Sequence, residues 1–159
     1  FHTVSQMNPQ ARLTLVGDGP LRKDIEKQVN TLGLRDKVVF TGIRRDVPEL
    51  LRKHHCFVLS SLWELQPITI LEAMRAGLPV IATNVGGVED TLVHEKTGLL
   101  VEVGDDKSLS AAMLKLVSDP ELSKTMGETG AIVVKERFSN ELVARRIESV
   151  YFSLLKATK

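Results

Sequence analysis

Two glutamates, Glu64 and Glu72, flank the start of a predicted helix in the segment WELQPITILEAMRAG. Pro67 lies between them and fits the first position of a helix, where the missing N–H of proline costs nothing. The backbone amides of residues 68–70 would then point out of the helix start without intrahelical partners. Such amides, together with the helix dipole, attract an anion, so the segment predicts a site for a phosphate group.

The chemistry of the two carboxylates extends this prediction. A carboxylate only accepts hydrogen bonds, so each glutamate suits hydroxyl groups. A phosphate between two hydroxylated groups is the form of a nucleotide sugar, and Glu72 lies about 7 Å along the axis from the helix start, within reach of a ribose. The alternative is that Glu64 only favours the helix dipole and that Glu72 pairs with Arg75. The spacing does not separate these interpretations.

Five short runs of β-branched and apolar residues predict the strands that must position this segment. Most are apolar at consecutive positions, as in strands that are buried on both faces. They are RLTLVG (12–17), KVVFTG (37–42), CFVLSS (56–61), PVIATN (79–84) and GLLVEV (98–103). Helical patterns alternate with these runs, which predicts an α/β fold, a Rossmann-like parallel sheet with helices on both faces.

The helical patterns have recognisable starts. They begin at Pro20, at Asp46 as part of a capping box, at Pro67 and around Gly87, and three C-terminal helices are expected over 106–117, 121–135 and 140–156, with Ser139 as the last cap. Small and polar residues, including Gly17 and Gly42-Ile43-Arg44, follow the strands, where such sheets bind ligands. Loops of this kind need glycine in any case, so this pattern alone does not establish a site.

Composition excludes several functions. The chain has 159 residues, enough for one domain, and its net charge of +1 gives no support for a nucleic-acid partner. Cys56 is the only cysteine, which rules out an internal disulfide framework and fits a reducing compartment. No apolar run is long enough to span a bilayer. His54-His55-Cys56 lacks further ligands for zinc, so a solvated helix end is expected there and no metal site.

Several motifs together resemble the donor site of the group-1 retaining glycosyltransferases (family four, GT-B architecture). The likeness covers nearly the whole chain in one order, and this order makes it specific. The motifs are Val16-Gly17-Asp18-Gly19-Pro20, Val39-Phe40-Thr41-Gly42, Leu59-Ser60-Ser61, Glu64, Pro67, Glu72-Ala73-Met74, Gly77 to Thr83, Gly86-Gly87, Thr97 to Val101 and Arg137-Phe138-Ser139.

The resemblance implies that residues 1–159 are a single nucleotide-sugar-binding domain, the C-terminal part of a two-domain enzyme. Glu72 would bind the ribose, and Glu64, the candidate catalytic residue, the transferred sugar. Gly42-Ile43-Arg44 would lie against a base such as that of UDP or GDP. The amides near Pro67, Ile68 and Thr69 would hold the diphosphate, and Gly17 and Gln66 would also belong to the donor-binding site. A sugar or lipid-linked acceptor would come through the other domain, and no metal or further cofactor is expected.

The sequence also departs from the family pattern. Leu65 and Gln66 stand where Gly and Phe are usual, which leaves the sugar contacts and the donor open. The family's first strand, which is central in the order 3-2-1-4-5-6, and its loop with an Arg and a Lys precede Phe1, so the isolated chain is expected to bind donors weakly and to lack transferase activity. The neighbouring strands would close up, borrow a partner or receive the strand from a longer protein.

These features define the remaining expectations. The exposed sheet gap or the last helix offers a route to self-association. A cytoplasmic location, free or peripheral at the inner face of the membrane, and a role in polysaccharide biosynthesis follow from the resemblance. The competing interpretations are a nucleotide-sugar epimerase of the same architecture and a non-catalytic nucleotide-binding or interaction module. Trp63 is expected in the core.

Overall fold

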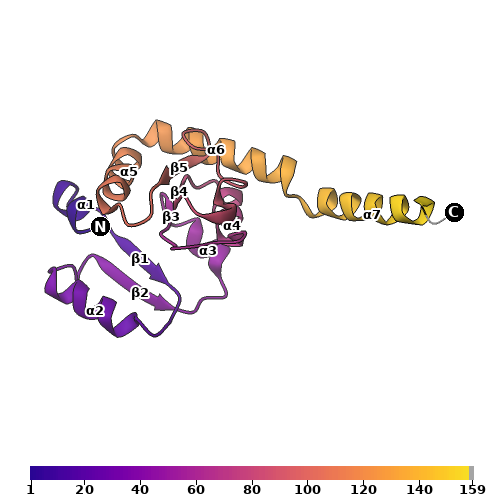
Figure 1. Cartoon of the computed structure of the whole chain (residues 1–159). Coiled ribbons are helices and arrows are strands. Elements are labelled where there is room, and N and C mark those ends of the chain that lie inside the picture. Colours follow the sequence, from indigo (N-terminus) through magenta and orange to yellow (C-terminus); the bar gives the residue numbers. More distant parts are fainter. Residues whose placement is uncertain (158–159) are drawn as a thin grey trace.

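The computed structural model describes residues 1–157, which form an α/β fold with parallel strand pairs (Figure 1). The strands are β1 (Leu13–Val16), β2 (Val38–Gly42), β3 (Phe57–Leu59), β4 (Val80–Thr83) and β5 (Gly98–Val101). The helices are α1 (His2–Met7), α2 (Arg22–Thr31), α3 (Val47–Leu51), α4 (Ile68–Arg75), η1 (Gly86–Val88, a 3-10 turn), α5 (Asp106–Ser118), α6 (Pro120–Arg137) and α7 (Asn140–Ala157). The predicted strands and the predicted fold class are confirmed.

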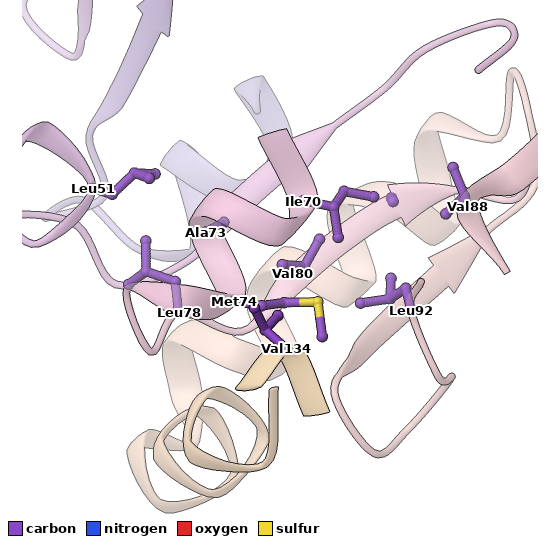
Figure 2. Close-up of a cluster of buried hydrophobic side chains, with 10 residues drawn as sticks. Leu51, Ile70, Ala73, Met74, Leu78, Val80, Val88, Leu92 and Val134 are labelled. Carbon is purple, nitrogen blue, oxygen red and sulfur yellow. The ribbon is translucent and has the colours of Figure 1, made fainter. Parts of the chain in front are cut away.

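β4 is the central strand of the larger sheet and is buried along its whole length. Val80 and Ala82 pack in a cluster with α3, α4 and the second half of α6, and Figure 2 shows Met74 of α4 extending toward Leu92 in this cluster. Ile81 packs in a second cluster with α1, α5 and the first half of α6. Because successive side chains of a strand point to opposite faces, helices on both faces explain why this run is apolar at every position.

The strands form two separate sheets, β1-β2 and β3-β4-β5. Over residues 1–157, β1 and β3 share no strand pairing, so of the three alternatives the one in which they close up is wrong. The side chains of β1 are half-buried or exposed and those of β3 half-buried, whereas β4 is fully buried. Both strands therefore have the burial of sheet edges, because the position between them, where the predicted order has a further strand, holds no strand of the described chain.

His54 lies in the segment between α3 and β3, and its side chain links this segment to β1 of the smaller sheet. Its Nδ1 lies 2.7 Å from the Leu50 carbonyl oxygen, and its Nε2 lies 2.8 Å from Thr14 Oγ1 of β1. Because a carbonyl oxygen only accepts, Nδ1 donates to it, and in the neutral ring Nε2 accepts from the Thr14 hydroxyl. The expectation of a solvated helix end is wrong for His54, which is half-buried.

Two predicted helix starts differ from the structure. Asp46 precedes α3 but does not cap it with its side chain, because its carboxylate pairs with the Arg44 guanidinium. The helix expected around Gly87 is only the turn η1. The cap by Ser139 is confirmed, since the Leu142 amide donates to its hydroxyl over 3.3 Å.

α7 extends away from the rest of the chain (Figure 1). Its predicted apolar face is exposed, including Val143, Ile147, Val150 and Tyr151. The sheet therefore does not bury this face. Over the part of the chain that the structure describes, no helix combines the length and the apolar composition that crossing a membrane requires.

Candidate functional site

Glu64 lies in the loop between β3 and α4, and both its side chain and its backbone are held by hydrogen bonds. The Ser61 hydroxyl donates a hydrogen bond to Glu64 Oε1 over 2.7 Å. The Gly87 amide donates to the Glu64 carbonyl oxygen over 3.2 Å. Glu64 is half-buried, so its carboxylate keeps contact with solvent while its backbone is fixed against η1.

Gly86 and Gly87 are required by this contact. A Cβ atom added to Gly86 would lie 1.8 Å from the Glu64 carbonyl oxygen, and one added to Gly87 would lie 1.8 Å from the Leu65 carbonyl oxygen. Gly86 also has a φ of +48°, in the region that favours glycine. The pair lets the backbone of one loop touch the backbone of another, which brings Glu64 to the start of α4.

The start of α4 presents two open amides. Pro67 is the residue before the helix, with a ψ of 97°, so the prediction that it occupies the first helical position is wrong by one residue. The Ile70 amide donates to the Pro67 carbonyl oxygen over 3.0 Å and is not available to a ligand. Across residues 1–157 no group accepts from the Ile68 or Thr69 amide, and no side chain caps the helix. The two amides at this end of the dipole are therefore open to an anion.

Glu72 lies on the same helix as these amides. It is four residues beyond Ile68, which corresponds to about 6 Å along the axis. Its side chain is exposed, and within the described chain it makes no ion pair or hydrogen bond, so the alternative pairing with Arg75 is absent. An exposed carboxylate without a protein partner keeps all its acceptor positions for a ligand's hydroxyl groups.

Gly17 and Gly42 lie together at the ends of β1 and β2. The Gly17 amide donates to the Gly42 carbonyl oxygen over 2.9 Å, and both glycines have positive φ values. Beyond them Ile43 is 81% exposed. Arg44 donates through Nε to Asp46 Oδ1 over 2.8 Å, and this hydrogen bond raises the pKa of Arg44 and lowers that of Asp46. The cation expected near a base is thus paired with a carboxylate in the free protein.

Arg22 is a second cation at these strand ends, which we did not include in the predicted site. Its Nε lies 2.8 Å from Glu26 Oε1, and its Nη1 lies 3.1 Å from Asp18 Oδ2. The hydrogen bond to Glu26 is the main cause of a raised pKa for Arg22. The guanidinium also lies 5.8 Å from the centre of the Phe40 ring. Its position at the start of α2, after Gly17-Asp18-Gly19, was the only sequence signal for it.

The predicted residues thus fall into two groups. Glu64, Gln66 to Thr69 and Glu72 lie on one loop and the helix that follows it. Gly17 and residues 42–44 lie on the smaller sheet, and within the described residues no hydrogen bond or ion pair joins the two groups. Each group follows the carboxyl end of a parallel strand, the position at which ligands of such sheets bind.

Exposed apolar side chains surround Glu64. Trp63 is 75% exposed, which makes the core prediction wrong, and Leu65 is 82% and Ile68 67% exposed. Gln66 is also exposed. The backbone of this loop lies against Gly86 and Gly87, while the side chains of Trp63, Leu65 and Gln66 are exposed to solvent.

Comparison with known proteins identifies the family. The profile described as "Glycosyl transferases group 1" matches residues 1–133. This chain belongs to that family. The group 1 resemblance predicted from the motifs is confirmed, and the matched range contains both glutamates and all of α4.

Individual relatives show how similar this chain is to other proteins. It is 38% identical over 149 residues to an N-acetyl-alpha-D-glucosaminyl L-malate synthase from Bacillus anthracis, which covers 94% of the chain and 39% of that protein. A sucrose-phosphate synthase from Thermosynechococcus elongatus has 32% identity and a TM-score of 0.88, over 98% of the chain and 41% of that structure. HepE from Anabaena in complex with UDP has 26% identity and a TM-score of 0.90, over 96% of the chain and 44% of that structure. The chain spans about two fifths of the length of these relatives.

Proposed function

We propose that this chain is the nucleoside diphosphate sugar-binding domain of a retaining glycosyltransferase that moves a sugar to an acceptor hydroxyl. In this proposal the Ile68 and Thr69 amides hold the diphosphate and the Glu72 carboxylate binds the ribose hydroxyls. Glu64 binds the transferred sugar, and residues 42–44 lie against the base. The single observation that carries the proposal is the exposed side chain of Glu72, about 6 Å along the helix axis beyond Ile68, on the same helix as two amides that donate to no protein group.

The proposed chemistry is electrostatic. As the bond between the sugar and the diphosphate breaks, negative charge grows on the departing diphosphate, and preorganised amides at a helix start stabilise that charge without a metal ion. A relative supports the ligand class, since HepE, at 27% identity and a TM-score of 0.88, has been solved in complex with UDP-glucose. The acceptor would enter from a part of the protein that the chain does not contain.

A titration tests the ribose assignment. UDP, GDP and ADP are titrated into the chain while the amide signals of residues 66–70 are followed by NMR. We expect one of the nucleotides to shift the amide signals of Ile68 and Thr69. Glu72→Ala is expected to weaken the binding of that nucleotide about tenfold or more, because a hydrogen bond to a charged group contributes about 1.5–3 kcal/mol. Glu128→Ala, which removes an exposed glutamate of α6, is the matched control. Unchanged affinity of Glu72→Ala for every nucleotide contradicts the assignment.

One observation favours a second candidate, a non-catalytic nucleotide-binding module. Leu65, at 82% exposure, presents a large apolar side chain directly after Glu64, where the resembling family has glycine. Turnover separates the candidates. The complete gene product is incubated with UDP-, GDP- and ADP-sugars, and release of the nucleoside diphosphate is measured with and without EDTA. Transferase function predicts release of the nucleoside diphosphate that Glu64→Gln lowers strongly and that EDTA leaves unchanged, whereas a binding module releases none.

A further inference from the structure

We propose that Ser61 is a positioning residue that orients the Glu64 carboxylate toward the transferred sugar. This inference rests on the proposed function and deepens it, because it adds a residue that acts through Glu64. Its basis is a chain of hydrogen bonds that runs from the buried central strand β4 to the exposed edge of the site.

The chain of bonds begins at Thr83, the last residue of β4, which is only 5% exposed. Its hydroxyl donates to the Ser61 carbonyl oxygen over 2.6 Å. This bond links residues that are 22 positions apart and fixes the backbone of Ser61 to the most buried strand of the fold. Ser61 is half-buried, two residues after the end of β3.

Ser61 then holds the side chain of Glu64. Its hydroxyl donates to Oε1 over 2.7 Å, within the range of a hydrogen bond to an ionised oxygen. The Gly87 amide holds the backbone of the same residue through its carbonyl oxygen. With one carboxylate oxygen engaged and the backbone fixed, the carboxylate of Glu64 keeps one orientation, and Oε2 remains for a hydroxyl of the sugar.

The Glu64 carboxylate must be oriented correctly to bind the transferred sugar. A glutamate has several rotatable bonds, and an exposed one loses that freedom when it binds a ligand. A carboxylate that is already oriented in the free protein keeps more of its interaction for the transition state. The Ser-x-x-Glu spacing of Ser61 and Glu64 resembles a helix capping box, yet no helix starts at Ser61, so the serine serves the carboxylate.

A double-mutant cycle in the complete gene product tests the inference. Ser61→Ala, Ser61→Thr, Glu64→Gln and the double variant are compared in kcat and donor KM, using UDP-glucose, or GDP-mannose where guanine nucleotides bind more tightly. We expect Ser61→Ala to lower kcat roughly tenfold with KM changed less than about twofold, and Ser61→Thr, which retains the hydroxyl, to restore kcat. In the Glu64→Gln background, Ser61→Ala is expected to have no further effect. Ser118→Ala is the matched control, because Ser118 is exposed at the end of α5 and its side chain makes no hydrogen bond to the described residues.

Binding to the chain itself gives a second readout. Ser61→Ala is expected to change the affinity for UDP-glucose by less than about twofold and to leave the affinity for UDP unchanged, since Ser61 orients Glu64 for the transition state and adds no contact to the bound donor. Additive effects of Ser61→Ala and Glu64→Gln, or failure of Ser61→Thr to restore kcat, overturn the inference and leave the proposed function intact. A wild-type protein that binds no nucleotide sugar overturns the proposed function, and the inference with it.

Discussion

The close contact between Gly87 and the loop that carries Glu64 predicts the effect of one added methyl group. A Cβ atom at residue 87 would lie 1.8 Å from the Leu65 carbonyl oxygen and 3.0 Å from its carbonyl carbon. The obstacle is backbone, so no side-chain rotation relieves it. In Gly87→Ala the two backbones must separate by about 1.6 Å before the Cβ···O distance reaches 3.4 Å, where ordinary van der Waals contact begins.

This displacement exceeds the roughly 1 Å misplacement that can lower a catalytic rate about a hundredfold. It also stretches the Gly87 to Glu64 hydrogen bond, which is 3.2 Å long. We therefore expect Gly87→Ala to lower kcat/KM of the complete gene product about a hundredfold. Overpacking of this kind costs about 2 kcal/mol of folding free energy, which is roughly 4–8 °C in Tm for a domain of this size.

The assays are donor turnover with UDP- or GDP-sugars and thermal unfolding by circular dichroism. Gly19→Ala is the matched control, because a Cβ there would meet nothing within 4 Å and the φ of Gly19 lies outside the region that favours glycine. The expected pattern is a large loss for Gly87→Ala and nearly wild-type behaviour for Gly19→Ala. If Gly87→Ala keeps kcat/KM within twofold of the control, the loop is not fixed by this contact and the reasoning fails.

Three further predictions concern stability and reactivity. Met74 is fully buried, so Met74→Ala is expected to cost about 2–5 kcal/mol in a urea titration, and a cost below about 1 kcal/mol would show that its cluster is loosely packed. The Ser108 hydroxyl and amide lower the pKa of Asp105. The stability from this cap is therefore present above pH 3.8 and lost as the pH falls through the lower folded pKa, so the difference in Tm between wild type and Asp105→Ala should shrink in acid. Burial raises the pKa of the Cys56 thiol from its ordinary value of 9.0, so the folded state keeps the thiol protonated and loses stability as the pH rises past 9.0. A disulfide reagent at pH 8 should therefore modify the folded chain more slowly than the urea-unfolded chain.

Local signals determined the elements and the family. The strands were predicted correctly because the runs from Arg12 to Val103 are apolar at consecutive positions, a property that each run carries in its own residues. The start of α4 was predicted to within one residue from Pro67, because proline fixes φ and donates no hydrogen bond. The spacing of Glu64 and Glu72 indicated a carboxylate on each side of that start, and family membership followed from the order of short motifs.

Contacts between distant segments were decided only by the tertiary structure. The bond from Thr83 to Ser61 and the approach of Gly87 to Leu65 join segments that are 22 residues apart, and no periodicity of 2 or 3.6 residues reports on such pairs. Trp63 is likewise exposed in the fold, although a large aromatic side chain favours burial, and its own residue type did not indicate this. The split into two sheets has the same origin, since backbone hydrogen bonding between strands depends on which strand lies beside which, and neither β1 nor β3 contains that information in its own residues.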